Sequence, residues 1–259
     1  MNKLLKASLL LLLCGMTSVA FAQKEYPKPE QMRPGMSEFW LPQPVIVTPG
    51  DIQKNTAPSD AIILFDGKDL SAWESVKDAS PAGWTVNGDG TFTVNKKAGD
   101  IRTKETFDSF QLHIEWSIPT NITGTSQARG NSGVYMQGMY ELQVLDSYEN
   151  ETYANGQAGS IYKQSTPLVN AMRKPGEWNV YDVIYTAPVF KEDGTYRFPP
   201  RVTVLHNGIV VQNNTTILGT TEYIGFPQVR PHGAGPIVLQ SHGDPSEPVS
   251  FRNIWIRKL

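Results

Sequence analysis

The amino-acid sequence predicts an all-β protein, built as a two-sheet sandwich with a proline-rich arm before it. From residue 60 onward the apolar runs are short, and turn residues separate them. The segment from Phe110 to Trp116 alternates apolar and polar side chains without a break, which is typical of a strand with one buried face. No stretch combines a sustained helical period with capping residues. About twelve short strands without helices indicate two packed sheets.

Composition narrows the possible functions before any motif is considered. Of the 259 residues, 39% are hydrophobic and 19% are charged, which is too apolar for a disordered chain and too polar for a protein with many membrane spans. The formal net charge is -2, from 23 basic and 25 acidic residues. A chain without a basic excess cannot neutralise many phosphates, so we expect no nucleic-acid partner.

Residues 1–22 carry the features of a cleavable signal peptide. Early lysines precede an apolar run that ends in Ala20-Phe21-Ala22, the small-residue pattern that signal peptidase reads. We expect cleavage before Gln23 and a periplasmic or secreted mature protein. The apolar run is too short to span a bilayer, so we expect no integral membrane segment after cleavage. A lipid-anchored start at Cys14 is the alternative, although lipidated cysteines usually follow a small residue and a leucine precedes this one.

Residues 23–58 form the proline-rich N-terminal arm. Seven prolines fall in this stretch, which excludes regular helix and central strand from most of it. It is either a free linker or an extended arm that packs on the body of the protein. The apolar cluster of Phe39, Trp40 and residues 45–47 favours the packed arm, because solvated linkers rarely carry such side chains. The remaining residues, 59–259, are expected to form one domain.

The strands of this domain are expected where β-branched and aromatic runs lie between Gly, Asn, Asp and Pro. These runs are residues 61–65, 84–86, 91–94, 110–116, 133–137, 140–145, 178–187, 201–205, 209–212, 237–240 and 251–257. Asn87-Gly88-Asp89-Gly90 and His206-Asn207-Gly208 are typical hairpin turns. We therefore expect His206 to be an exposed turn residue.

Several strands place polar side chains on the face opposite the core. The residues that alternation assigns to one outer surface are His113, Glu115, Tyr135, Gln137, Glu141, Gln143, Gln240 and His242. An ordinary solvated sheet face is the simpler interpretation. Amide and aromatic side chains also suit sugars, because planar amides pair with hydroxyls and rings stack on the apolar faces of pyranoses. A carbohydrate cleft is therefore an equally supported hypothesis.

A set of short segments, taken in order, carries a resemblance to a known family. These segments are LFDGKDLSAW at 64–73, NSGVY at 131–135, YELQVLD at 140–146, EWN at 177–179, NG at 207–208, LQSHG at 239–243 and FRNI at 251–254. Together they resemble the DUF1080 family, also called the 3-keto-disaccharide hydrolase domain, over residues 60–259. The resemblance implies a concanavalin A-like jelly-roll sandwich with glycoside chemistry on a concave sheet. This sequence departs from the family pattern at Gln137, where relatives often have arginine. The absence of that positive charge would change how the site binds a polar sugar.

The standard glycosidase pattern is not established by the carboxyl groups of this sequence. Such enzymes need two carboxyls, about 5–5.5 Å apart for retention and roughly 6.5–9.5 Å apart for inversion. Glu141 and Asp146 fall on opposite faces of an ideal strand. Glu115 has the right parity to be the second carboxyl only if its strand lies close to that of Glu141.

A 3-keto sugar, which the resemblance implies as substrate, relaxes this requirement. The ketone acidifies the C2 proton, so a base can remove it before the C1 leaving group departs and water adds. Glu141 and His242 are the candidate catalytic acid and base. The candidate substrate-binding residues are Asn131, Tyr135, Gln137, Gln143, Gln240, Glu115 and His113.

The expected partner is a carbohydrate. No dense His, Asp and Glu ligand motif occurs in the sequence, so no metal and no cofactor are predicted. The alternative to an enzyme is a lectin-like protein that binds sugar on the same sandwich without turnover, because one fold hosts both functions.

Overall fold

The structure, a computed structural model, describes residues 28–51, 54 and 56–259, so the expected signal peptide lies outside the described residues. The chain divides into two compact units, residues 1–45 and 46–259. In the first unit the described residues form a single 3₁₀ turn, η1 (Pro34–Met36). Phe39 and Trp40 are 93% and 74% exposed, and their packing as part of the arm stays a prediction. The boundary between the units falls inside the expected arm, so its last residues belong to the sandwich.

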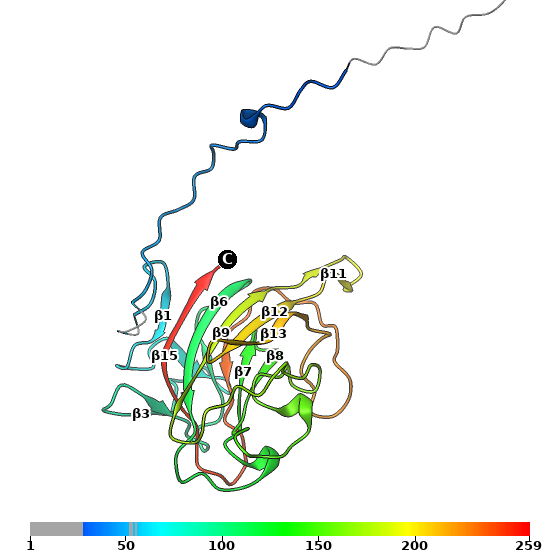
Figure 1. The fold of residues 1–259 in the computed structure, drawn as a ribbon. Helices are drawn as coiled ribbons and strands as arrows, with labels where there is room; N and C mark the ends of the chain where they lie inside the picture. The colour runs from blue at the N-terminus through cyan, green and yellow to red at the C-terminus, as the bar shows by residue number, and fades with distance from the viewer. Residues whose placement is uncertain (1–27, 52–53, 55) are drawn as a thin grey trace, which may run out of the picture. The chain divides into compact units, whose positions relative to one another are not determined.

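The larger sheet runs in the order β13-β12-β9-β6-β15-β4-β3, with β1 paired to β15 (Figure 1). Its strands are β1 (Ile62–Phe65), β3 (Thr85–Val86), β4 (Phe92–Thr93), β6 (Phe110–Ser117), β9 (Trp178–Thr186), β12 (Arg201–His206), β13 (Ile209–Thr216) and β15 (Ser250–Lys258). All of its pairings are antiparallel.

The smaller sheet runs in the order β2-β5-β14-β7-β8, again antiparallel. Its strands are β2 (Trp73–Ser75), β5 (Ile101–Thr103), β7 (Ser132–Met136), β8 (Tyr140–Val144) and β14 (Val238–Leu239). A separate hairpin joins β10 (Val189–Phe190) and β11 (Tyr196–Phe198). Two further 3₁₀ turns, η3 (Ser126–Ala128) and η4 (Ala154–Gly156), lie in loops next to the smaller sheet.

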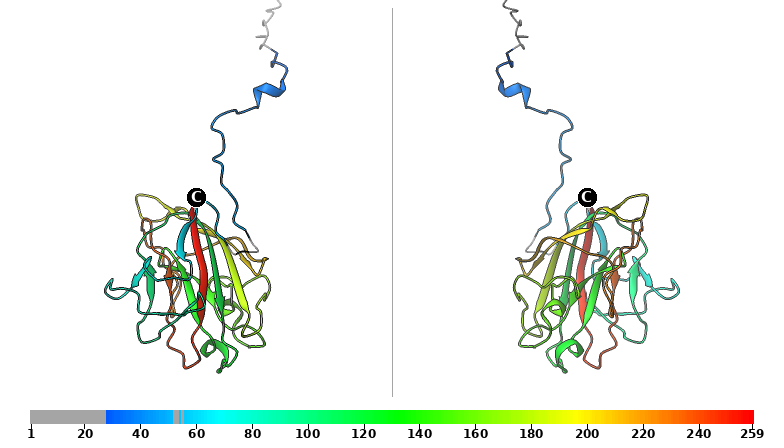
Figure 2. Two further views of the ribbon diagram at one scale, coloured as in Figure 1. Left: turned by 90° about the vertical axis from the view of Figure 1, so that its left-hand side faces the viewer. Right: turned by 90° about the vertical axis from the view of Figure 1, so that its right-hand side faces the viewer.

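The two sheets pack face to face over one apolar core (Figure 2). The inward residues of β6, from Phe110 to Trp116, are fully buried, as their alternation predicts. Val134 and Leu142 of the smaller sheet are equally buried and belong to the same cluster. Burying side chains of this size contributes roughly 1.5–3 kcal/mol each, which explains how a sandwich can hold without a disulfide. The predicted all-β, two-sheet sandwich is confirmed.

The predicted turns explain most of the connections. Asn207 and Gly208 both have positive φ, 53° and 80°, and they join β12 to β13 as a two-residue hairpin. The prediction for the residue before them is wrong. His206 is fully buried, stacks on Trp116 with ring centroids 5.7 Å apart, and contacts the Asn179 side chain at 3.0 Å. It is the last residue of β12, and its side chain turns into the core.

Two loop segments cover strand β8, which lies at the edge of the smaller sheet. Gln143 N donates to Ser160 O at 3.0 Å, and Tyr162 N donates to Glu141 O at 3.1 Å. Glu141 N donates to the Thr221 hydroxyl at 2.9 Å. These bonds satisfy an otherwise open edge and hold both loops along it. No helix in the part of the chain that the structure describes is long and apolar enough to cross a membrane.

Candidate active site

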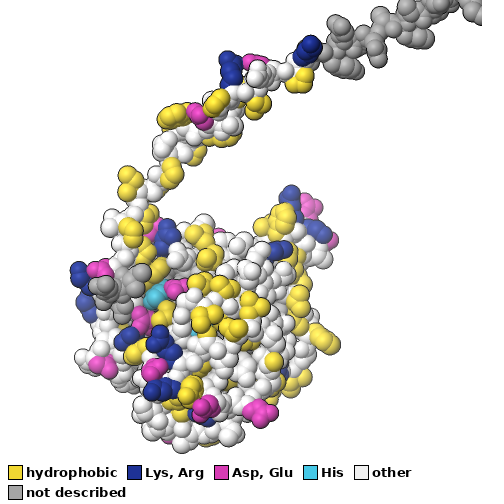
Figure 3. Space-filling view, viewed as in Figure 1, with side chains coloured by type: hydrophobic (Ala, Val, Ile, Leu, Met, Phe, Trp, Pro, Cys, Tyr) yellow, Lys and Arg dark blue, Asp and Glu magenta, His cyan; other side chains and the backbone are white. Residues whose placement is uncertain are grey.

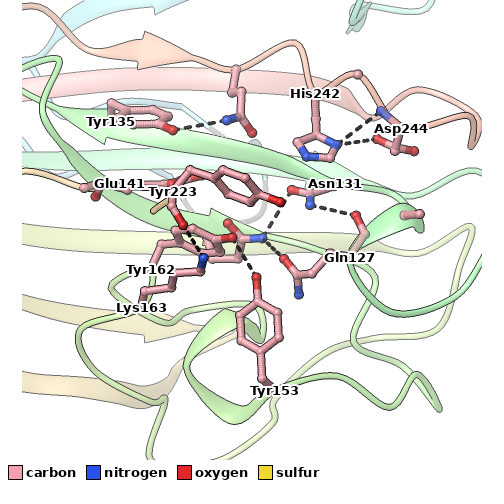
Figure 4. Close-up of a pocket in the computed structure, with 15 residues that line it drawn as sticks. Gln127, Asn131, Tyr135, Glu141, Tyr153, Tyr162, Lys163, Tyr223, His242 and Asp244 are labelled. Carbon is pink, nitrogen blue, oxygen red and sulfur yellow. Dashed lines mark hydrogen bonds and ion pairs between the residues drawn. The ribbon is translucent and has the colours of Figure 1, made fainter. Parts of the chain in front are cut away.

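A cleft of about 840 Å³ lies on the outer face of the smaller sheet (Figure 4). This volume suits a small-molecule ligand. Its lining residues are Gln127, Ala128, Asn131, Tyr135, Glu141, Gln143, Tyr153, Tyr162, Lys163, Thr221, Tyr223, Gln240, His242, Gly243 and Asp244.

Strand register places the polar side chains of the cleft floor in rows. Tyr135 of β7 lies opposite Glu141 of β8, and Gly133 lies opposite Gln143. Gln240 follows β14, and its backbone N donates to Gly133 O at 3.0 Å. Because side chains alternate along each strand, all of these residues project to the same face. The shared outer surface expected from the sequence is therefore present for this part of the smaller sheet.

Gly133 provides the space that the Glu141 carboxyl occupies. A Cβ at this position would stand 2.4 Å from Glu141 Oε1 and 3.0 Å from the Tyr135 ring. The carboxyl group therefore lies across the glycine, next to the tyrosine. Any side chain here would displace the carboxyl, since the two cannot occupy the same space.

Glu141 carries a buried carboxyl group with no cationic partner among the described residues. Its side chain is 3% exposed, and burial raises its pKa to about 8, against the opposing effect of a hydrogen bond with Tyr135. At neutral pH the carboxyl is therefore mostly protonated and can donate a proton. Perturbation of this kind in a cleft is typical of functional sites.

Tyr135 links Glu141 to the neighbouring strand. Gln240 Nε2 donates to the Tyr135 hydroxyl oxygen at 3.1 Å. Burial raises the pKa of Tyr135, so its hydroxyl keeps its proton and serves as a donor toward Glu141. The chain of bonds from Gln240 through Tyr135 fixes the orientation of the carboxyl.

A cluster of amides forms the next part of the floor. Gln143 Nε2 donates to Gln127 Oε1 and to Asn131 Oδ1, both at 3.2 Å, and Asn131 Nδ2 donates to Gln127 O at 2.8 Å. Gln143 Oε1 and Gln240 Oε1 are buried without a hydrogen-bond partner in the described structure. Unpaired acceptors in a cleft favour a ligand that brings hydroxyl donors.

His242 forms a pair with Asp244 at one end of the cleft. His242 Nδ1 lies 2.9 Å from Asp244 Oδ2, and Asp244 is 7% exposed. Burial opposes the charge of Asp244, but hydrogen bonds from His242 and Ser246 hold its pKa at about 2. Asp244 N also donates to Nδ1 at 3.3 Å. In the tautomer that carries the proton on Nδ1, the Asp244 carboxylate accepts it and the lone pair on Nε2 is free to act as a base.

The other end of the cleft is aromatic. We call Tyr153, Tyr162, Tyr223 and Lys163 the tyrosine wall. The hydroxyls of Tyr153 and Tyr162 lie 2.6 Å apart. Lys163 Nζ stands 4.5 Å from the ring centre of Tyr223 and 5.4 Å from that of Tyr162, and it donates to Tyr223 O. Gly156 leaves room for the Tyr153 ring, because a Cβ there would stand 2.2 Å from it.

Six of the nine predicted site residues meet in this cleft. They are Glu141, His242, Asn131, Tyr135, Gln143 and Gln240. The placement of the other three on the same surface is wrong. Two of them belong to the larger sheet, and the third lies in a turn.

Gln137 fails because the strand ends before it. β7 stops at Met136, and Gln137 has a φ of 51° in the turn to β8. Its side chain points inward, where Nε2 donates to Phe107 O at 3.0 Å and Oε1 accepts from the Tyr185 hydroxyl at 2.7 Å. The departure from the family pattern at this position therefore lies outside the cleft.

His113 and Glu115 line a second cavity, of about 710 Å³, on the outer face of the larger sheet. We call it the charged cavity. Figure 3 shows histidine, acidic and basic side chains gathered on one face of the molecule. His113 Nδ1 lies 2.7 Å from Asp182, and Glu115 accepts from Arg252 Nε at 2.6 Å and from Asn253 Nδ2 at 2.8 Å.

The charges of the two predicted residues are stabilised in this cavity. Burial alone would lower the pKa of His113, but its bonds to Asp182 and Glu115 raise it to about 9. Burial alone would raise the pKa of Glu115, but hydrogen bonds from His113, Asn253 and Arg252 lower it to about 2. Both groups are therefore ionised at neutral pH and satisfied by their neighbours.

Sequence reasoning missed the residues that loops bring to the cleft. These are Gln127, Tyr153, Tyr162, Lys163, Thr221, Tyr223 and Asp244. Side-chain alternation predicts orientation only within strands. The residues of the tyrosine wall lie in loops, so no periodic pattern in the sequence could indicate them. Asp244 could have been found from its spacing, because a carboxylate two residues after a histidine often closes a local turn.

No group of three or more His, Cys, Asp or Glu residues that could hold a metal ion occurs among the residues that the structure describes. Asp146 contributes no second carboxyl to the cleft. It is fully buried and forms an ion pair with Arg129, with Oδ2 and Nε 2.8 Å apart.

The fold and the cleft can be compared with those of known proteins, and the comparisons place the chain in a class of carbohydrate-active proteins. The family model of the 3-keto-alpha-glucoside-1,2-lyase-like domain matches residues 60–257, and this chain belongs to that family. The predicted family and the jelly-roll fold are thereby confirmed.

Solved structures from Parabacteroides distasonis are similar to this chain. One, described as a candidate glycosyl hydrolase, shares 72% sequence identity, with a TM-score of 0.85, over 88% of this chain and 97% of its own. A second, described in the same way, shares 24% identity with a TM-score of 0.54, over 77% of this chain and 94% of its own, which supports the fold alone. None of the curated proteins matches this chain.

Proposed function

We propose that this protein is an enzyme that cleaves the glycosidic bond of 3-keto-glucosides by elimination, with Glu141 as the acid and His242 as the base. One observation carries the proposal: a buried carboxyl, whose pKa burial raises to about 8, and a histidine bonded to a carboxylate line the same cleft. A carboxyl that burial keeps protonated can act as an acid, and an imidazole within the same cleft can act as a base.

The reaction divides into two proton transfers. His242 Nε2 removes the proton on C2, which the neighbouring C3 ketone acidifies. The electron pair left on C2 forms a C1=C2 double bond as the bond between C1 and the glycosidic oxygen breaks. Glu141 protonates the departing oxygen, so a free aglycone and a conjugated enone leave the site. Positioned acids and bases of this kind contribute typically 10²–10⁴-fold each.

The amide floor supports this chemistry by holding the sugar. Gln143 Oε1 and Gln240 Oε1 can accept hydroxyl hydrogens, and the Asn131 and Gln127 amides surround the same place. Negative charge moves to the C3 oxygen as C2 loses its proton, and donors directed at that oxygen lower the barrier. Water that later adds to the enone would convert elimination into net hydrolysis, which accounts for both names of the family.

Product analysis tests the proposal. The protein is incubated with matched pairs of glucosides, one unoxidised and one 3-keto, and aglycone release is followed together with ultraviolet absorbance. We expect release only from the 3-keto member, with an absorbing enone as the first product. Release without an enone would indicate direct hydrolysis. Sugar binding without any release would support the alternative, a lectin-like binding protein.

Export of the protein is part of the proposal. The Ala20-Phe21-Ala22 sequence after an apolar run supports cleavage before Gln23 and a periplasmic or secreted enzyme. Mass spectrometry of the protein recovered from its native host checks this. A first residue of Gln23 is expected, whereas a lipid-modified Cys14 at the N-terminus would contradict it.

A further inference from the structure

The tyrosine wall comes from loop segments bonded to the backbone of Glu141. Tyr162 N donates to Glu141 O at 3.1 Å, so the wall begins one hydrogen bond from the proposed acid. Tyr223 follows Thr221, whose hydroxyl accepts from Glu141 N at 2.9 Å. Gln143, two residues further along β8, is instead bonded to Gln127 and Asn131. Gln127 Nε2 also donates to Thr152 Oγ1 and Gly156 O, on either side of Tyr153, so the amides and the tyrosine wall line one continuous cleft (Figure 4).

The proposed roles of Glu141 and His242 give the bound substrate a direction. If Glu141 protonates the glycosidic oxygen, that oxygen must lie beside Glu141, because it joins the sugar to the aglycone. The base, His242, acts on the sugar and lines the cleft together with the amides. The sugar then lies between Glu141 and His242, and the aglycone extends from Glu141 onto the tyrosine wall. This step rests on the proposed function.

The chemistry of the wall selects among possible aglycones. The rings of Tyr153 and Tyr162 stand 6.2 Å apart at an interplanar angle of 58°, an arrangement that offers ring edges and faces to a planar guest. The Lys163 ammonium has no carboxylate within ion-pair distance in the described structure. A cation beside the guest attracts the negative face of an electron-rich ring.

We propose that the tyrosine wall is an aglycone subsite for an electron-rich aromatic ring, such as that of a phenol. A second sugar would need amides or carboxylates to pair with its hydroxyls, and the four side chains of the tyrosine wall include neither. The surface beyond the wall is also apolar. Tyr223, Ile224 and Phe226 are 74%, 85% and 85% exposed, which leaves room for an aglycone with more than one ring.

Two measurements test the proposed subsite independently of the proposed reaction. Binding of phenyl and methyl glucosides of the same anomer, both unoxidised, is measured by calorimetry and needs no turnover. In parallel, kcat/KM is measured for the phenyl and methyl 3-keto-glucosides and expressed as a ratio. A 3-keto disaccharide, whose aglycone is a second sugar, is measured in the same way. We expect wild-type protein to prefer the phenyl member in both measurements and to prefer it over the disaccharide.

Tyr223 is exposed, so its substitution should not disturb folding, and its variants can test the subsite alone. Tyr223→Ala should lower the phenyl-to-methyl ratio by about threefold to tenfold, the effect of one aromatic contact. Tyr223→Phe keeps the ring and should retain the preference. Phe198→Ala removes an aromatic ring that is 59% exposed on β11, outside the cleft, and should leave the ratio unchanged.

The outcomes distinguish the two proposals. Phenyl-selective binding that Tyr223→Ala abolishes, without turnover of any 3-keto substrate, supports the subsite and removes the proposed reaction. Turnover with no phenyl preference, or with a preference for the disaccharide, overturns the subsite and leaves the reaction in place. An equal loss for phenyl and methyl substrates in Tyr223→Ala also overturns it.

Discussion

The two outer faces of the sandwich each carry a buried glutamate and a histidine, and the pKa values of the two glutamates are shifted in opposite directions. In the charged cavity, Glu115 has a pKa of about 2 and His113 a pKa of about 9, because each is bonded to partners that favour its charge. In the cleft, Glu141 has a pKa of about 8, because burial is opposed only by a neutral tyrosine. Residue type alone therefore does not separate structural from chemical roles.

The difference lies in what the surrounding sequence supplies. β15 brings Arg252 and Asn253 to Glu115, so the carboxylate is neutralised and satisfied. β7 brings Gly133 and Tyr135 to Glu141, which gives it space and a single donor. A carboxyl that is buried without a cation costs stability and gains a proton. We infer that the unpaired Glu141 carboxyl makes the cleft reactive at a cost in folding stability. The paired charges of the charged cavity instead stabilise the fold.

The largest expected contrast is in turnover. Glu141→Gln keeps the shape of the side chain and removes the transferable proton, so turnover of a 3-keto-glucoside should fall about 10²–10⁴-fold with little change in binding. Glu115→Gln, the matched control on the other face, should leave turnover within a small factor of wild type. Single-turnover kinetics and a binding titration measure both. Full activity in Glu141→Gln, or a comparable loss in Glu115→Gln, would break the comparison.

The position of the carboxyl can be tested without removing it. In Gly133→Ala the new Cβ would stand 2.4 Å from Glu141 Oε1, so the carboxyl must move. We expect turnover to fall about tenfold to a hundredfold, since small misplacements of a reacting group are costly. The melting temperature should change little, because the end of a side chain can shift cheaply. A large loss of stability with normal turnover per folded molecule would contradict this account.

The charged cavity should show its role in unfolding experiments. Glu115→Gln leaves Arg252 and His113 without their carboxylate, and we expect the free energy of unfolding to fall by about 1–3 kcal/mol. Glu141→Gln should leave it unchanged or raise it, because an amide has no charge to desolvate. Urea titrations at neutral pH compare the two variants. Equal destabilisation would mean that both glutamates are structural.

The pH dependence of stability sharpens the same contrast. His113 and Glu141 have raised pKa values in the folded protein, so each contributes stability that is complete below its unfolded pKa and is lost as pH rises through about 9 and about 8. Glu115 has a lowered pKa, so its contribution is present above pH 4.5 and is lost as pH falls toward about 2. His113 and Glu141 should therefore cost wild type stability as pH rises from 4.5 to about 9, Glu141 between 4.5 and about 8 and His113 between 6.5 and about 9.

Two variants assign this loss to its groups. Glu141→Gln should reduce the loss between pH 4.5 and about 8, and His113→Gln should reduce it between pH 6.5 and about 9. Chemical denaturation at several pH values provides the measurement. An unchanged slope in both variants over these ranges would contradict the assigned pKa shifts.

The smallest expected effect concerns the arm. Its last residues, Val47, Pro49 and Pro58, line the charged cavity, and Thr48 N donates to the Ser59 hydroxyl at 3.0 Å. Deleting residues 23–58 should lower the melting temperature by a few degrees through lost burial. Turnover should survive, since the cleft lies on the other sheet. An unchanged melting temperature would mean that the arm is a linker.

Regular strands were the predictable part of this molecule. Alternation along residues 110–116, 132–136 and 140–144 identified the core-facing side chains correctly, because a side-chain period of two leaves no other choice once one face is apolar. The short strands β2 and β5 were missed, since three residues carry too little pattern. They form only when neighbouring strands pair with them.

The candidate site was predictable only where it lies on strands. Glu141 and Gln143 followed from alternation, whereas Gln137 was misplaced by a left-handed turn residue that reverses the direction of the side chain. The tyrosine wall comes from loops held on the edge of β8 by backbone bonds that no local pattern encodes. His113 and Glu115 had the right parity, but parity cannot say which sheet a strand joins.

The central claim is that Glu141 is protonated near neutral pH while Glu115 is ionised. Nuclear magnetic resonance of protein labelled with ¹³C in the glutamate carboxyl groups measures both directly, with signals assigned from Glu141→Gln and Glu115→Gln. We predict that Glu141 titrates at about 8 and Glu115 at about 2. Titration of Glu141 near the ordinary value of 4.5 would contradict the claim, because the cleft would then lack its acid at neutral pH.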